Sequence, residues 1–117
     1  MLTFVCHEKC STCKKARDFL TANGVPFSAR DIKGRNPTKD ELAAWLRLSG
    51  LPIRRLFNAS GMLYRELGLS AKIDSLSEEE ALSLLATDGM LVKRPILVGA
   101  DFVLFGFQEK EWAQRVK

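Results

Sequence analysis

Short apolar runs alternate along the chain with stretches in which apolar residues recur at helical spacing. The short runs predict strands at residues 2–6, 94–98 and 102–105, and residues 26–32, which are polar on one face, predict a fourth. Apolar residues three and four positions apart predict four longer helices, at residues 11–23, 38–50, 77–88 and 108–116. Two shorter helical pieces are expected at residues 52–57 and 63–67.

The predicted order is strand–helix–strand, then a helical insertion over about residues 38–88, then strand–strand–helix. The first two strands should be parallel, with a right-handed crossover through the helix. The last two strands are separated by a short turn at residues 99–101 and should form an antiparallel hairpin. We therefore expect an α/β fold with a mixed four-stranded sheet flanked by helices, in a single domain over residues 1–117.

Capping residues mark where the insertion's helices begin and end. Thr38 with Glu41, and Ser77 with Glu80, each have the spacing of a capping box. Residues 88–89 (Asp-Gly) are expected to end the second of these helices, because glycine accepts the left-handed conformation that follows many helix C-termini.

Composition adds limits on the compartment and on partners. The chain has 117 residues, 46% apolar and 27% charged, which is ordinary for a globular protein. It has neither an apolar run of about 18 residues nor the features of a signal peptide, so we expect a cytoplasmic protein without membrane contact. The net charge of +4 is spread along the whole chain, which argues against direct binding to nucleic acid.

All three cysteines, Cys6, Cys10 and Cys13, lie at one predicted strand-to-helix turn. Cys10 and Cys13 frame a C-x-x-C sequence that opens the helix. In the cytoplasm such cysteines are more often catalytic, redox-sensing or metal-binding than structural. A C-x-x-C in a strand–helix–strand unit indicates thiol–disulfide chemistry, and the alternative is two unrelated, half-buried cysteines.

The nucleophile in this chemistry is a thiolate, and a cysteine with a pKa of about 8.5 is only about 3% ionised at pH 7. Lowering that pKa by about two units requires about 2.7 kcal/mol. Cys10 is predicted at the N-cap, where the helix terminus supplies about 0.3–1 kcal/mol and about 2 kcal/mol at best. A cation from elsewhere must contribute, and Arg94, directly before Pro95 at the start of a strand, is the best candidate.

The other residues of the turn have separate expected roles. Cys13 lies one helical turn after Cys10 and is placed to form a disulfide with it as the resolving thiol. Cys6 ends an apolar strand, so we expect it to pack in the core. His7 is expected in an exposed loop.

The three cysteines also have the spacing of the iron–sulfur motif of radical-SAM enzymes. Those enzymes need a large barrel, which 117 residues cannot build, and Thr12 stands where they usually have an aromatic residue. A zinc site would need a fourth ligand, and the only histidine, His7, is adjacent to Cys6. We therefore expect no bound metal.

Three segments carry a resemblance to a known family: residues 10–16 (CSTCKKA), 64–69 (YRELGL) and 93–98 (KRPILV). In this order and spacing the chain resembles the arsenate reductase (ArsC)/Spx/MgsR family over essentially its whole length. The resemblance implies a thioredoxin-like sheet with a helical insertion, Cys10 as the redox-active cysteine and Arg94 as its cationic neighbour. Thr12 and Pro95 are the candidate binding positions next to these two residues.

The resemblance implies arsenate reduction only where three arginines surround the cysteine. Arg94 corresponds to one of them, whereas Asn58 and Phe107 stand at the other two positions, with Arg54 and Arg55 nearby in sequence. Asn and Phe cannot give an oxyanion the bidentate, charged contact of an arginine. We therefore expect a thiol–disulfide or glutathione-dependent reductase rather than an arsenate reductase.

Such a reductase would act on an oxidised thiol, such as a protein disulfide or a glutathione adduct, and would hold no bound cofactor. Glutathione or thioredoxin would be its reductant. The alternative that the resemblance leaves open is an Spx-like redox sensor, which regulates transcription by binding the RNA polymerase α-subunit.

Overall fold

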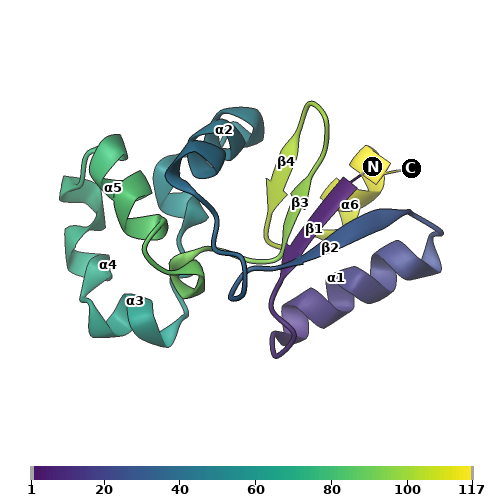
Figure 1. Ribbon diagram of the computed structural model, residues 1–117, viewed down its shortest axis with the longest axis horizontal. Coiled ribbons are helices and arrows are strands. Elements are labelled where there is room, and N and C mark those ends of the chain that lie inside the picture. Colours follow the sequence, from purple (N-terminus) through teal and green to yellow (C-terminus); the bar gives the residue numbers. More distant parts are fainter. Residues whose placement is uncertain (1, 117) are drawn as a thin grey trace.

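The computed structural model describes residues 2–116 and folds their strands into one four-stranded sheet (Figure 1). The strands are β1 (Leu2–Cys6), β2 (Phe27–Asp31), β3 (Ile96–Val98) and β4 (Val103–Phe105), in the spatial order β2-β1-β3-β4. β1 and β2 are parallel, whereas β3 is antiparallel to both β1 and β4. The mixed sheet predicted from the sequence is confirmed.

The α-helices of the described chain are α1 (Ser11–Ala22), α2 (Lys39–Ser49), α3 (Met62–Glu66), α4 (Leu69–Lys72), α5 (Glu78–Leu85) and α6 (Glu109–Val116). Short 3-10 helices follow α2, α4 and α5, namely η1 (Ile53–Leu56), η2 (Ile73–Ser75) and η3 (Gly89–Leu91). Between β2 and β3 the only strand-like pairing described is an isolated bridge from Phe57 to Val92. The helical insertion is therefore confirmed, although α4 is not among the predicted helices. No helix within residues 2–116 is long and apolar enough to span a membrane.

Both predicted capping boxes are present. The hydroxyls of Thr38 and Ser77 accept hydrogen bonds from the backbone N–H groups of Glu41 and Glu80. The two glutamates in return accept the backbone N–H of the capping residue. These reciprocal bonds satisfy donors that would otherwise be unpaired, which fixes the starts of α2 and α5.

The predicted end of α5 at residues 88–89 is wrong. The helix ends at Leu85, and the Asp88 side chain instead accepts the Met90 N–H at the start of η3. Gly89 is needed there for close packing, because a Cβ would lie 2.5 Å from the backbone oxygen of Ile32. The glycine therefore marks a contact between the insertion and the end of β2, and does not terminate a helix.

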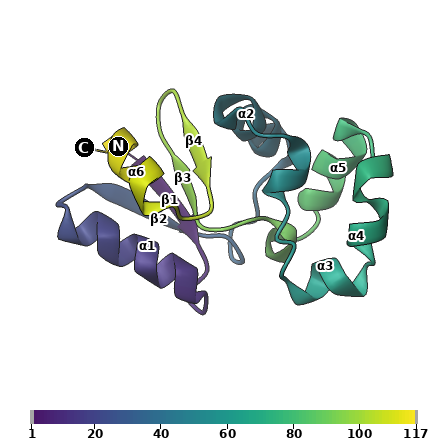
Figure 2. The ribbon, with the colours of Figure 1, turned by 180° about the vertical axis from the view of Figure 1, so that it is seen from behind.

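The strands separate two layers of core packing, because alternate side chains point to opposite faces of a sheet. The face toward α1 and α6 carries Phe4, Leu97 and Leu104. The face toward the insertion carries Val5, Ile96 and Val103. Figures 1 and 2 show α3, α4 and α5 grouped at one end of the molecule, with α1 and α6 at the other.

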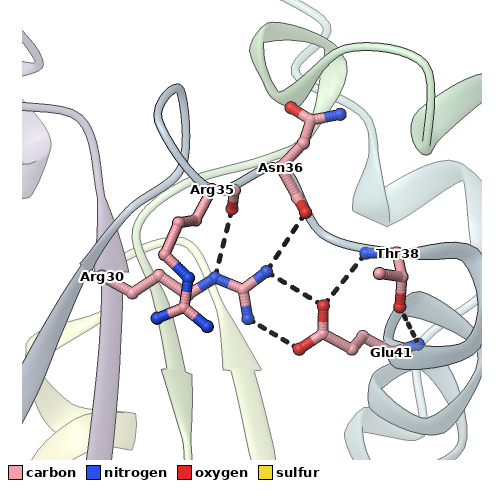
Figure 3. A network of polar contacts seen from close by, with 5 residues as sticks. All are labelled: Arg30, Arg35, Asn36, Thr38 and Glu41. Atoms are coloured by element: carbon pink, nitrogen blue, oxygen red, sulfur yellow. Dashed lines mark hydrogen bonds and ion pairs between the residues drawn. The ribbon is translucent and has the colours of Figure 1, made fainter.

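A polar network joins β2 to α2 at the base of the insertion (Figure 3). Arg30 donates to both carboxylate oxygens of Glu41, at 2.6 and 2.9 Å. It also donates to the backbone carbonyls of Arg35 and Asn36, at 3.1 and 3.2 Å, and its guanidinium lies 5.7 Å from the Trp45 ring centre. This network fixes the position of the insertion relative to the sheet.

Candidate functional site

The turn between β1 and α1 places Cys10 at the start of the helix. The Cys10 N–H donates to the His7 carbonyl at 3.0 Å, and the Cys10 carbonyl accepts the Lys14 N–H at 3.1 Å. Its backbone is extended, with φ −92° and ψ 118°, and the first turn of α1 holds no acidic residue. Cys10 is therefore the N-cap, as predicted, and its half-buried side chain lies at the positive end of the helix dipole.

Cys10 and Thr12 border a cavity of about 640 Å³. The rest of its wall comes from the insertion, from the residues before β3 and from the segment that leads from β4 into α6. Its cationic side chains are Arg54, Arg55, Lys93 and Arg94, whereas Glu111 is the acidic residue among those that line it. This excess of positive charge favours an anionic ligand.

Sheet pairing explains why Arg94 lies beside the cysteine turn. Val5 in β1 pairs with Ile96 in antiparallel β3, so the residues after β1 meet those before β3. The peptide bond between Arg94 and Pro95 is cis. The Nε and Nη1 atoms of Arg94 are buried and have no hydrogen-bond partner among the described residues. Because unpaired buried donors are costly, this guanidinium is suited to meet an anion in the cavity.

The surroundings of Cys10 lower its pKa below the ordinary value of a thiol. Burial is the largest single influence and raises the pKa, since it disfavours the charged form. It is outweighed by hydrogen bonds from the backbone N–H and the thiol of Cys13, by the charge of Arg94, and by the backbone N–H of Thr12. The helix terminus and the distant arginine thus act together on this thiol.

Cys13 lies behind Cys10, with 3% of its surface exposed. Its Sγ accepts the backbone N–H of His7 at 3.4 Å. Its S–H donates to the sulfur of Cys6, and this bond, reinforced by burial, raises the pKa of Cys13. All three cysteines are free thiols. Cys13 is therefore held as a protonated thiol beside Cys10. Separately, no three His, Cys, Asp or Glu side chains within residues 2–116 are grouped to hold a metal ion.

The structure brings most of the predicted site residues together. Cys10, Thr12 and Arg94 border the same cavity, and Cys13 contacts Cys10 from behind. Pro95 is different, because it is buried and is not among the residues that line the cavity. Its carbonyl accepts the Gly106 N–H at 2.8 Å, so it fixes the backbone beside Arg94 instead.

Two expectations for the start of the turn have different outcomes. Cys6 is buried in the core as predicted, with 7% of its surface exposed, but it also contacts the Arg17 guanidinium. The expectation of an exposed His7 is wrong. This residue is half-buried, and its Nδ1 is buried without a hydrogen-bond partner in the described chain.

Sequence reasoning did not place Arg54, Arg55 and Lys93 at the site. The available signal was their position, since the first two lie shortly before Asn58 and the third directly precedes Arg94. Asn58 also lines the cavity, as does Phe107, so both uncharged positions noted in the sequence face the same space.

Known proteins resemble this chain over nearly its whole length. It is 43% identical over 113 residues to the uncharacterized protein YusI of Bacillus subtilis, covering 97% of this chain and 96% of YusI. It is 29% identical over 110 residues to the regulatory protein MgsR of the same species, covering 94% of this chain and 86% of MgsR. A crystal structure of an ArsC family related protein from Bacteroides fragilis has a TM-score of 0.97 and 47% identity, covering 99% of this chain and 97% of that one.

The match extends to the family pattern itself. The sequence pattern of the ArsC family covers residues 6–115, which include the cysteine turn, the insertion and the final hairpin. The sheet and its helices have the thioredoxin-like arrangement expected of that family. The chain belongs to the ArsC family.

Proposed function

We propose that the protein is a thiol-dependent reductase, in which the Cys10 thiolate attacks a disulfide or a glutathione adduct. The observation that carries this proposal is the position of Cys10 at the N-terminus of α1, open to a cationic cavity in which Arg94 has unpaired, buried N–H groups. The lowered pKa of Cys10 supports it, because a larger fraction of the thiol is ionised at neutral pH.

The reaction consists of two thiol–disulfide exchanges. The Cys10 thiolate attacks the glutathione sulfur of an adduct R–S–SG, forming Cys10–S–SG while the electron pair leaves on the substrate thiolate, RS⁻. A second glutathione thiolate then attacks this mixed disulfide, which releases glutathione disulfide and restores Cys10. In the alternative second step Cys13 attacks the Cys10 sulfur of the mixed disulfide, and glutathione leaves as a thiolate that takes up the Cys13 proton, so that an internal Cys10–Cys13 disulfide remains.

The cavity favours glutathione over a neutral thiol as the reductant. Its volume of about 640 Å³ lies within the range of about 300–1,000 Å³ that is usual for small-molecule sites. Glutathione carries two carboxylates, and Arg54, Arg55 and Lys93 supply cations around the same space as Cys10. We place the activity in the cytoplasm, where glutathione is abundant and free thiols such as these persist. Thioredoxin remains the alternative reductant.

Arsenate is not the substrate in this proposal. Of the three positions at which arginines would surround the oxyanion, Arg94 carries a guanidinium, whereas Asn58 and Phe107 border the cavity without charge. Arg54 and Arg55 line the same cavity from other positions, and in this proposal they contact the carboxylates of glutathione. Arsenate-dependent turnover with a thiol reductant, lost in Cys10→Ser, would overturn this part of the proposal.

The activity is tested with the mixed disulfide of glutathione and 2-mercaptoethanol, with glutathione and glutathione reductase, by following NADPH oxidation. We expect multiple turnovers for the wild type, none for Cys10→Ser, and a lower kcat/KM for Arg94→Ala than for Arg94→Lys. Arg47→Ala is the matched control, because Arg47 is exposed on α2 and is not among the residues that line the cavity. Turnover by Cys10→Ser, or no turnover by the wild type, would contradict the proposal.

Similarity to the regulatory protein MgsR favours a second candidate. In this alternative the Cys10–Cys13 pair senses redox state, and its disulfide changes affinity for the α-subunit of RNA polymerase without turnover. The test is binding of the reduced and oxidised protein to the purified C-terminal domain of that polymerase subunit. Binding that depends on redox state, together with stoichiometric oxidation only, would favour the sensor over the enzyme.

A further inference from the structure

Cys6 has a cationic neighbour of its own. Arg17, one helical turn after Cys13, directs Nη2 to within 3.6 Å of the Cys6 sulfur. The same guanidinium lies 5.6 and 5.8 Å from the ring centres of Phe4 and Phe27. These rings hold the arginine in place over the sulfur. A neutral thiol gains only a weak hydrogen bond from such a contact, whereas a thiolate is stabilised by it more strongly.

The electrostatics of Cys6 agree with this geometry. The S–H bond from Cys13 is the largest influence, and together with the hydrogen bond and the charge of Arg17 it lowers the pKa of Cys6 to about 6. Burial and the carboxylate of Asp31 oppose this effect. While Cys13 is a thiol, Cys6 is therefore suited to ionise at neutral pH, although it is buried. Once Cys13 is in a disulfide it has no proton to donate, and Arg17 is the group that still stabilises the Cys6 thiolate.

Cys13 lies between two sulfurs of this kind. Its thiol stays protonated, and its single S–H proton can be donated to the sulfur of Cys6 or to that of Cys10. Cys10 faces the cavity, whereas Cys6 lies in the core layer beneath α1. The three thiols thus form a chain from the cavity to the interior, with Cys13 in the middle.

We propose that Cys6 is a third redox-active thiol of this site, and that Cys13 transfers its disulfide bond from Cys10 to Cys6. The transfer step rests on the proposed function, because that reaction supplies the Cys10–Cys13 disulfide. The Cys6 thiolate attacks the Cys13 sulfur, the Cys6–Cys13 bond forms as the Cys10–Cys13 bond breaks, and the electron pair leaves on the Cys10 sulfur. One disulfide and one thiolate are present before and after, so no further oxidant is required.

The environments of the two outer sulfurs suit this exchange. Arg17 stabilises the attacking thiolate, and the α1 N-terminus with Arg94 stabilises the leaving one. A thiol of low pKa leaves faster, which favours departure of Cys10. The transfer stores the disulfide in the interior and returns Cys10 to the thiolate form, ready for another substrate.

Tryptic mapping distinguishes the two disulfides directly. Cleavage after Lys9 and Lys14 places Cys6 on peptide 1–9, and both Cys10 and Cys13 on peptide 10–14. A Cys10–Cys13 bond therefore stays within one peptide, whereas a Cys6–Cys13 bond links two. We expect wild-type protein treated with glutathione disulfide, then acid-quenched and alkylated, to yield the linked pair. Wild-type protein whose disulfides all stay within peptide 10–14 or on glutathione would overturn the transfer.

Variants separate this inference from the proposed reductase. In Cys10→Ser oxidised with diamide, a small oxidant of thiols, we expect loss of both remaining free thiols and formation of the linked peptides. In Cys13→Ser the linked peptides should be absent. Linked peptides that persist in this variant would assign the bond to Cys6 and Cys10 and refute the relay. Two free thiols retained in oxidised Cys10→Ser would refute the role of Cys6. If instead Cys10 forms no glutathione adduct in the wild type, the reductase fails, while the Cys10→Ser result still decides whether Cys6 pairs with Cys13.

Cys6→Ser and Cys6→Ala should both lose the linked peptides. Two variants are used because either change in the core could disturb folding. Arg17→Met provides the more specific readout, because it keeps an apolar side chain beside Phe4 and removes only the cation. We expect a reduced yield of linked peptides at neutral pH, restored as the pH is raised. A yield unchanged from the wild type at neutral pH would exclude Arg17 from the relay.

Discussion

Replacing Glu41 with Gln should remove the charge that joins the sheet to the helical insertion, while leaving the cap of α2 in place. Glu41 is the third residue of that helix, a position at which Gln completes a capping box as Glu does. The ion pair with Arg30 is lost, and Arg30 is left with 10% of its side chain exposed and a charge partly unpaired. The change therefore isolates the ion pair from the cap.

The pKa of Glu41 sets an upper limit on the magnitude. It is lowered from an ordinary 4.5 to about 2, chiefly by the Arg30 hydrogen bonds and also by hydrogen bonds with Thr38 and by the charge of Arg30, against the effect of burial. At about 1.4 kcal/mol for each pKa unit, this difference corresponds to about 3 kcal/mol. Because 36% of the Glu41 side chain is exposed, solvent screening reduces the expected loss to about 1–2 kcal/mol.

Urea unfolding of the wild type and Glu41→Gln at neutral pH measures this loss. Glu80→Gln is the control, because Glu80 occupies the same position in the second capping box and forms no ion pair within the described residues. The contribution of Glu41 is complete above its unfolded pKa and is lost as the pH falls through the folded value, so the difference between variants should shrink between about pH 4.5 and 2. Equal loss in both variants, or a difference that does not change with pH, would refute the reasoning.

Three further substitutions test the packing around the site by urea unfolding. Gly89→Ala should destabilise by about 1–3 kcal/mol, since its Cβ would meet the Ile32 backbone oxygen; wild-type stability would show that the turn moves freely. Trp112→Phe leaves the Gly106 carbonyl without its 3.0 Å donor in a buried position, at a cost of about 1–3 kcal/mol, and a neutral result would show that this bond contributes nothing. Thr38→Ala removes the cap of α2, with an expected loss of about 1 kcal/mol. An unfolding midpoint equal to that of the wild type would contradict this expectation.

Local signals explain which parts of the fold the sequence predicts well. The strand at residues 2–6, the helix after Cys10 and the capping boxes at Thr38 and Ser77 depend on neighbouring residues, and the structure has them where expected. The short α4 carries no capping side chain and spans Leu69–Lys72, so propensity over so few residues does not reveal it. The end of α5 differs from the prediction because Gly89 serves a contact with Ile32 that is distant in sequence.

The site shows the same division between local and long-range information. Cys10 at the helix N-terminus follows from the C-x-x-C alone, and Arg94 follows from the need for a cation to complete the stabilisation of a thiolate. The contact between Arg17 and Cys6 is not predicted, although helical spacing does place Arg17 on the face of Cys13. The missing information is that the end of β1 lies beneath that face, which is a property of the packed sheet and helix.

The pKa of Cys10 tests most directly whether this thiol is the nucleophile of the site. It is measured from the pH dependence of alkylation with iodoacetamide, followed by mass spectrometry on tryptic peptide 10–14. Only the thiolate reacts, so the rate rises through the pKa and then levels off. We expect a midpoint below the ordinary value of about 8.5, a higher midpoint in Arg94→Ala, and no change in Arg47→Ala. A wild-type midpoint at the value of a free thiol would contradict the assignment of Cys10, and an unchanged midpoint in Arg94→Ala would remove Arg94 from the site.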